Sequence, residues 1–448
     1  MSELVHEIRN RVREDMPRIR GDLERLIRIP SVSAEGFDAA HVRASADATA
    51  ELLQNRGVGG VRLLEVEGSH PAVFGEIPGT SGAPTILLYA HHDVQPPGNV
   101  SAWNSDPFEP TERDGRLYAR GSCDDKAGIA VHAAAVAAYE GSPPIGVKVF
   151  IEGEEEIGSE HLSGFLAEHG ALLEADTLVL ADSSNWRIGV PALTTSLRGL
   201  ADCVVEVRTL DHAVHSGMYG GPAPDALTAL ARLLASLHDD RGSVAVAGLS
   251  AAPARDVDLP EEDYRADAGV LDGVQLVGEG SITERMWTRP ALSVLGIDAP
   301  RVAEAANQLV PVARAKVSLR IPPGIEAAKA LDALTAHLES NAPWGARVVV
   351  TQGSTGEPFD VNADGATYDA ARRAFRDAWD HEAVDIGVGG TIPLVKAFAD
   401  AYPRAALLLT GVEDPDGRAH GENESLNLAE FERACVAEAL LLSYLAPS

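Results

Sequence analysis

The chain has 448 residues, which exceeds one typical hydrophobic core and suggests about two or three domains. Its formal net charge of −30 disfavours nucleic acid and anionic membranes as partners. No apolar run is long enough to span a bilayer, and the amino terminus lacks the apolar core of a signal peptide. We therefore expect a cytoplasmic protein in which the widely spaced Cys123, Cys203 and Cys435 are free thiols.

The first part of the chain alternates helical and strand patterns. Helices are expected at about 3–28, 41–56, 129–139 and 160–169, and strands at 61–66, 71–77, 85–91, 147–151 and 178–181. Strands that alternate with helices are typical of an α/β protein with a doubly wound sheet. The pattern returns after Pro358, with helices at 366–379 and 428–445 and a strand at 405–409.

Between these two parts the pattern differs. Strands at 200–210, 314–321 and 346–351 alternate apolar and polar residues, and helices are expected at 226–237 and 327–338. The segment 239–272 reads as a long loop. We predict a doubly wound mixed sheet in residues 1–193 and 356–448, with a smaller α+β domain inserted at 194–355.

Polar residues follow the predicted strands at their carboxyl ends, where doubly wound sheets bind ligands. They are His91, Asp93, Glu155, Glu156 and Asp182. Because side chains alternate along a strand, His91 and Asp93 face one side and His92 the other. Asp93 can then bond the far nitrogen of His91, which is how metal-ligating histidines are usually oriented.

Each candidate ligand also has an ordinary structural interpretation. Asp124 suits a helix N-cap, the run 154–156 suits a solvated acidic surface, and His420 suits a surface loop. Together they provide the oxygen and imidazole ligands that two divalent ions with one bridging carboxylate require. The candidate ligands are His91, Asp124, Glu156, Asp182 and His420.

The order of these motifs along the chain resembles a known family. It is His-x-Asp at 91–93, Asp-Asp-Lys at 124–126, Glu-Glu at 155–156, Asp182, His-Ser-Gly at 215–217, Arg-x-Pro-Pro at 320–323, Gly-Gly-Thr-Ile-Pro at 389–393 and His420. This order resembles the di-zinc metallopeptidases that include carnosinases, bacterial dipeptidases, succinyl-diaminopimelate desuccinylase and aminoacylases. The similarity is greatest to the dipeptidase and carnosinase-like branch.

The resemblance implies a role for each ligand. His91 and Asp182 would hold one zinc, Glu156 and His420 the other, and Asp124 would bridge them. Manganese or cobalt could replace zinc at such ligands.

The resemblance also implies roles for the residues beside the ligands. Glu155 would be the general base, Asp93 the partner of His91, and the Asp124–Asp125 peptide bond would be cis. Because Glu154, Glu155 and Glu156 are consecutive, two different pairs could match the Glu-Glu motif of the family. The Ile-Gly-Ser that follows at 157–159 favours the pair Glu155 and Glu156.

The inserted domain would be a lid and dimerisation domain of a homodimer. His215 would reach the partner subunit's site and stabilise the oxyanion, and Arg320, Gly390 and Thr391 would bind the substrate's terminal carboxylate. The ordinary alternatives are a turn residue for His215 and an exposed strand charge for Arg320.

The implied activity is metal-dependent hydrolysis of dipeptides or short peptides by a zinc-bridged hydroxide, with Glu155 transferring the proton. Asp182 and the His-Asp-Val-Gln-Pro-Pro run at 92–97 favour a dipeptidase. An N-acyl amino acid deacylase or desuccinylase would use the same site, and a non-catalytic homologue would keep the fold. A phosphoesterase is disfavoured because no basic or glycine-rich phosphate cradle accompanies the ligands.

Overall fold

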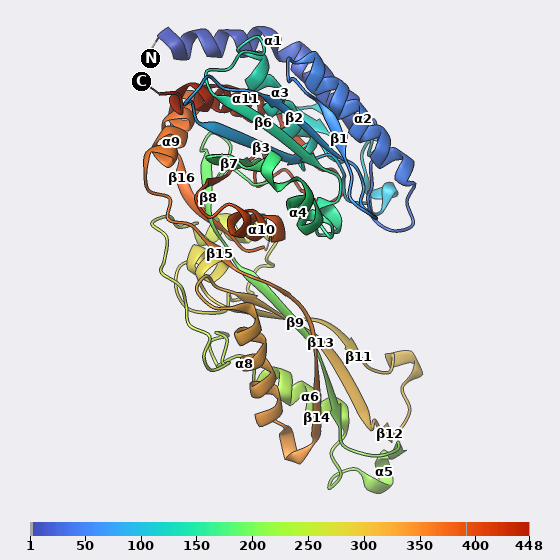
Figure 1. Cartoon of the computed structure of the whole chain (residues 1–448). Coiled ribbons are helices and arrows are strands. Elements are labelled where there is room, and N and C mark those ends of the chain that lie inside the picture. Colours follow the sequence, from blue (N-terminus) through green and yellow to red (C-terminus); the bar gives the residue numbers. More distant parts are fainter. Residues whose placement is uncertain (1–2, 391, 448) are drawn as a thin grey trace. The chain divides into compact units, whose positions relative to one another are not determined.

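A computed structural model describes residues 3–390 and 392–447 (Figure 1). The chain divides into two compact units. The first unit comprises Met1–Thr195, Val361–Ile386 and Pro393–Ser448, and the second comprises Ser196–Asp360 and Gly387–Ile392. Among the described helices, none combines the length and the apolar composition that crossing a bilayer requires.

Most strands of a large mixed sheet lie in the first unit. Its strands run in the order β1 (Arg62–Leu64), β2 (Ala72–Ile77), β6 (Gly146–Glu152), β3 (Thr85–His91), β7 (Thr177–Leu180), β17 (Ala406–Leu409), β8 (Ala192–Leu197) and β15 (Phe359–Asp360), with β16 (Val384–Val388) also paired to β8. The neighbours β6, β3, β7 and β17 are parallel, whereas β1, β2 and β8 pair antiparallel to their neighbours. The predicted α/β class with a mixed sheet is confirmed.

Helices cover both faces of this sheet. α1 (Glu3–Ile27), α3 (Lys126–Ala137) and α11 (Leu428–Tyr444) lie on one side, and α4 (Leu162–Leu173) and α10 (Pro393–Ala401) on the other (Figure 1). α2 (Ala39–Asn55) packs against β2, and α9 (Ala366–Trp379) against α11.

Helix α3 is central to this packing because it contacts α1, α11 and β3. Every residue from Lys126 to Val136 is buried, and a helix that is buried all round needs the small apolar residues found here. Asp124 and Asp125 therefore lie at the amino end of a firmly held helix.

A small antiparallel sheet joins two distant segments of the first unit. It has the order β18 (Ser425–Asn427), β5 (Arg116–Tyr118) and β4 (Thr111–Arg113). Ser425 pairs with Tyr118, so the segment before β18 lies beside the segment after β5.

The second unit is an antiparallel sheet covered by two helices. The strand order is β11 (Ala291–Asp298), β13 (Val312–Ile321), β9 (Gly199–Arg208) and β14 (Arg347–Gly356). α6 (Ala226–Ala235) and α8 (Ala327–Ser340) pack against it. Residues of β9 alternate between buried and more exposed positions, as the sequence pattern predicts for a sheet with one covered face.

The remaining elements are short. They are η1 (Val100–Ala102), η2 (Glu155–Ile157), β10 (Val214–His215), α5 (Ser216–Tyr219), α7 (Glu261–Asp267), η3 (Glu284–Thr288), η4 (Val302–Glu304), β12 (Gln308–Leu309) and η5 (Pro343–Gly345). The sequence patterns missed β11 because most of this edge strand is exposed and shows no alternation. The segment 239–272, expected to be one loop, contains α7.

The burial of β3 gives a prediction about stability. Leu88 is fully buried at the middle of this strand. We expect Leu88→Ala to lower the free energy of unfolding by about 2–5 kcal/mol, because the deletion leaves a cavity that the sheet cannot fill. Urea unfolding of the metal-free protein measures this change in the free energy of unfolding. Val100→Ala, at a side chain that is 57% exposed, is the control and should change little. Equal effects of the two substitutions would contradict this packing.

Candidate metal centre

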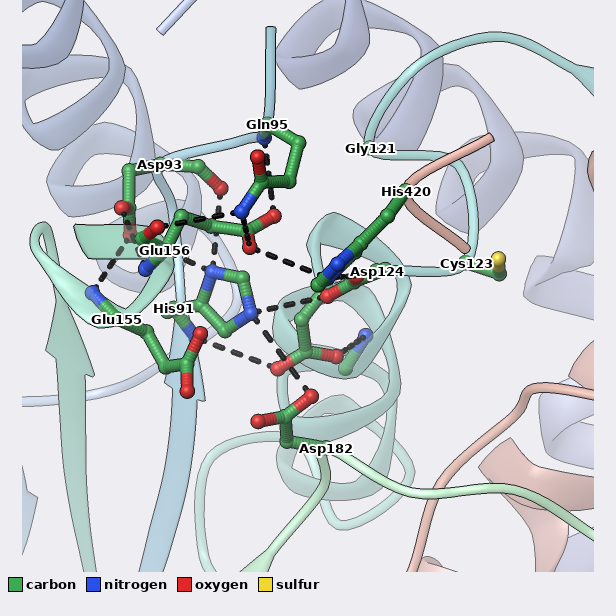
Figure 2. A network of polar contacts seen from close by, with 12 residues as sticks. His91, Asp93, Gln95, Gly121, Cys123, Asp124, Glu155, Glu156, Asp182 and His420 are labelled. Carbon is green, nitrogen blue, oxygen red and sulfur yellow. Dashed lines mark hydrogen bonds and ion pairs between the residues drawn. The ribbon is translucent and has the colours of Figure 1, made fainter. Parts of the chain in front are cut away.

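The structure brings the five predicted ligands together in the first unit (Figure 2). His91 ends β3, Asp182 follows β7, and Glu156 lies in the short helix after β6. Because β6, β3 and β7 are parallel neighbours, their carboxyl ends meet at one edge of the sheet. Asp124 precedes α3, and His420 lies in the loop between β17 and β18.

The ligand atoms form two groups that share Asp124. The first group is His91, Asp124 and Asp182, and the second is Asp124, Glu156 and His420. Within each group the ligand atoms lie within 4.8 Å of one another. In the first group, His91 Nε2 is 3.1 Å from Asp124 Oδ1 and 3.9 Å from Asp182 Oδ1.

The second group uses the other oxygen of Asp124. His420 Nε2 is 3.0 Å from Asp124 Oδ2 and 3.3 Å from Glu156 Oε2. Each oxygen of Asp124 thus faces a different histidine, as a carboxylate that bridges two cations requires.

The charges of this cluster favour cations. Burial and the charge of Asp124 raise the pKa of Glu156 to about 7, and burial also raises the pKa of Asp182 to about 6. Hydrogen bonds to Asp124 and Glu156 raise the pKa of His420 to about 11. Burial opposes the ionisation of Asp124, but the hydrogen bonds from His420 and His91 lower its pKa. Imidazole and carboxylate donors at this spacing fit zinc, manganese or cobalt.

Asp93 orients both His91 and the glutamate pair. His91 Nδ1 lies 3.1 Å from the carbonyl oxygen of Asp93 and 3.3 Å from its Oδ1, which directs Nε2 to the ligand groups. The same buried carboxylate accepts the amides of Glu155 at 3.3 Å and Glu156 at 3.1 Å. The hydroxyl of Ser33 donates to it at 2.7 Å.

The contacts of Glu154 and His92 agree with the predicted choice of neighbouring residues. Glu154 accepts the amide of His70 at 2.6 Å and pairs with His161 Nδ1 at 2.9 Å, so it is engaged outside the ligand groups. His92 Nε2 donates to the carbonyl of Pro71 at 2.8 Å, also outside them. Glu155 and Glu156 are therefore the glutamates at the centre, where Figure 2 shows the Glu155 side chain beside His91. The Asp124–Asp125 bond is cis, as the resemblance implies.

Sequence reasoning assigned no role to Gln95. Its backbone amide donates to Glu156 Oε1 at 2.9 Å and its side-chain amide donates to Glu156 Oε2 at 2.9 Å. The available signal was alternation, because Gln95 follows His91 and Asp93 at intervals of two residues.

His215, Arg320 and Gly390 lie in the second unit. His215 is exposed, and its Nδ1 accepts the amide of Gly217 at 3.0 Å, which matches the ordinary turn interpretation. Arg320 is half-buried on β13, and Gly390 follows β16. Thr391 lies outside the described residues. Functions for these four residues stay predictions.

Several known proteins are similar to this chain in sequence and in fold. Residues 87–443 match the family described as Peptidase family M20/M25/M40. The chain belongs to this family. Its relatives in it include the cysteinylglycine-S-conjugate dipeptidase of Corynebacterium striatum, which is 39% identical over 370 residues covering 81% of each chain. The beta-Ala-His dipeptidase of Homo sapiens is 30% identical over 376 residues, covering 80% of this chain and 74% of the relative.

A solved structure shows the same family fold. The crystal structure of human carnosine dipeptidase 1 matches with a TM-score of 0.80 and 26% identity, covering 99% of each chain. The family resemblance seen in the sequence motifs is confirmed, and this M20 chain is a metallopeptidase homologue over nearly its whole length.

The shared position of Asp124 gives a prediction about metal content. We expect His91→Ala and His420→Ala each to weaken one zinc site, and Asp124→Ala to weaken both, because Asp124 belongs to both ligand groups. Zinc bound after dialysis, measured by elemental analysis, distinguishes these cases. His381→Ala, at an exposed histidine of the first unit, is the control. Full zinc content in all three ligand variants would refute the assignment.

Proposed function

We propose that this protein hydrolyses the peptide bond of dipeptides or short peptides with two divalent metal ions, zinc in the native enzyme. The observation that carries the proposal is the pair of ligand groups that share Asp124, in a chain that belongs to a peptidase family. His91 and Asp182 would hold one ion, and Glu156 and His420 would hold the other. The dipeptidase names of the two relatives support the substrate class.

Glu155 moves the proton in this mechanism. The chemistry that two divalent ions supply when bound is polarisation of the scissile carbonyl and a lower pKa of water. The Glu155 carboxylate lies beside the ligand groups and takes a proton from the attacking water. It then gives the proton to the leaving amine. Asp93 holds the amide of Glu155 in place.

The roles proposed for the second unit concern a homodimer. We assign it the role of lid and dimerisation domain, with His215 stabilising the oxyanion in the partner subunit's site and with Arg320, Gly390 and Thr391 binding the substrate carboxylate. Exposed apolar residues on the edge strand β11, Val294, Leu295 and Ile297, support an interface there because such edges are usually covered. A cytoplasmic location is supported by the free thiols of the cysteines.

The competing functions share the fold and differ in substrate. An N-acyl amino acid deacylase or desuccinylase would use the same metal ligands. A non-catalytic homologue is disfavoured because all five ligand positions carry suitable side chains that converge.

A substrate panel separates these functions. We expect the purified protein to cleave cysteinylglycine and β-alanyl-histidine, to lose activity on chelation, and to regain it with zinc or manganese. N-acetyl and N-succinyl amino acids serve as the comparison, measured by release of free amine. Cleavage of the acylated compounds alone would favour the deacylase, and metal binding without cleavage of any compound would favour the non-catalytic homologue.

The role of Glu155 is tested separately from metal binding. We expect Glu155→Gln to lower kcat by about 100-fold or more, because a general base typically contributes at least that much. Zinc content should stay unchanged, because Glu155 belongs to neither ligand group. Glu160→Gln, at an exposed glutamate nearby, is the matched control. Near-normal kcat, or loss of zinc, in Glu155→Gln would show that the base is assigned wrongly.

A further inference from the structure

One of the buried acids close to the metal centre, Glu424, belongs to neither ligand group. Glu424 is fully buried, four residues after His420 and directly before β18. Its Oε1 accepts the backbone amides of Cys123 at 3.0 Å and Asp124 at 3.3 Å. Its Oε2 accepts the amide of Gly121 at 3.1 Å. Three backbone amides of the loop that ends in the shared ligand thus donate to this one carboxylate.

Arg120 neutralises this buried charge and extends the network. Its Nη1 donates to Glu424 Oε2 at 2.7 Å, and both side chains are at most 1% exposed. Its Nη2 donates to the carbonyl oxygens of Gly421 and Pro96, each at 3.2 Å. Gly421 is next to His420, and Pro96 is next to Gln95, which holds Glu156. The Arg120–Glu424 pair therefore contacts the segments that carry Asp124 and His420, and it contacts the segment of Gln95, which in turn holds Glu156.

The two loops need such a connection because they are far apart in the chain. Cys123 and Glu424 are 301 residues apart, and the pairing of Ser425 with Tyr118 brings their segments together. The His420 loop also has three residues other than glycine in the left-handed region, Arg418, His420 and Asn423, at φ of 57°, 62° and 63°. Such conformations persist where the surrounding contacts hold them. His91 and Asp182, in contrast, follow strands of the sheet.

We propose that Glu424, paired with Arg120, is the positioning residue that sets the spacing of Asp124 and His420 and so the metal affinity of the group Asp124, Glu156 and His420. The inference rests on the proposed function. A buried ion pair by itself is weak evidence for stability, and its better attested role is to specify one arrangement. Glu424 acts through the loop amides and touches neither substrate nor metal.

The test compares two neighbouring glutamates in the full chain. Glu424→Gln keeps the shape of the side chain, removes the charge that pairs with Arg120, and places an NH2 group against amide donors. Glu422→Gln makes the same chemical change on the same loop, where the carboxylate contacts the amide of Asn99 instead. Calorimetric titration of the metal-free proteins with zinc measures both sites, and cobalt absorption spectra report the ligand geometry.

We expect Glu424→Gln to weaken the second site by about 10-fold or more while the first site keeps its affinity, because partners that orient ligands typically contribute this much. The cobalt spectrum should change in the same variant only. The double variant Arg120→Met/Glu424→Met removes both charges and keeps the volume, so it should fold and still bind zinc weakly at the second site.

Wild-type zinc affinities and an unchanged cobalt spectrum in Glu424→Gln would overturn the inference. Strong binding at both sites in a folded double variant would overturn it as well. The readout is metal binding without substrate, so failure of peptide hydrolysis and failure of this inference give different results.

Discussion

The structure of the site depends on the crowding of negative charge at the carboxyl ends of three parallel strands. Asp124, Glu155, Glu156 and Asp182 carry buried carboxyl groups in one place, and burial raises the pKa of the last three. Like charges held this closely destabilise one another unless cations lie between them. The two ligand groups provide places for two such cations, and a shared Asp124 lets one carboxylate serve both. Bound cations would thus stabilise the local fold by offsetting the repulsion among these carboxylates.

The ligands come from segments that local structure alone cannot bring together. Parallel strands position His91 and Asp182, and α3 fixes the position of Asp124. Hydrogen-bonded side chains hold the rest: Asp93 binds the amides of the glutamate pair, Gln95 holds Glu156, and Glu424 binds the loop before Asp124. Asp93 and Glu424 accept hydrogen bonds from backbone amides, and Glu424 also accepts one from the buried Arg120, as buried carboxylates require. The network explains how loops, rather than strands, can hold ligands at fixed spacing.

The sequence predicted the part of this arrangement that local periodicity encodes. Alternation along β3 predicted that Asp93 lies on the same side of the strand as His91 and that His92 lies on the opposite side. The order of strands and helices predicted the mixed sheet. The sequence offered Asp124, in a loop before a helix, as a residue whose two oxygens could each face one metal, and the family resemblance assigned it the bridging role. Arg120 and Glu424 were missed because their partners are distant in the chain, and a single sequence carries no local signal for such contacts. Gln95 was missed although it continues the alternation of His91 and Asp93. The edge strand β11 was missed because exposure removes the pattern by which buried strands are found.

The two ligand groups require that two cations bind side by side and share Asp124. Anomalous diffraction from zinc-loaded crystals, collected on both sides of the zinc absorption edge, tests it most directly. The account predicts two peaks about 3.5–4 Å apart, one bounded by His91, Asp124 and Asp182 and the other by Asp124, Glu156 and His420. A single peak, or two peaks that do not both contact Asp124, would contradict it.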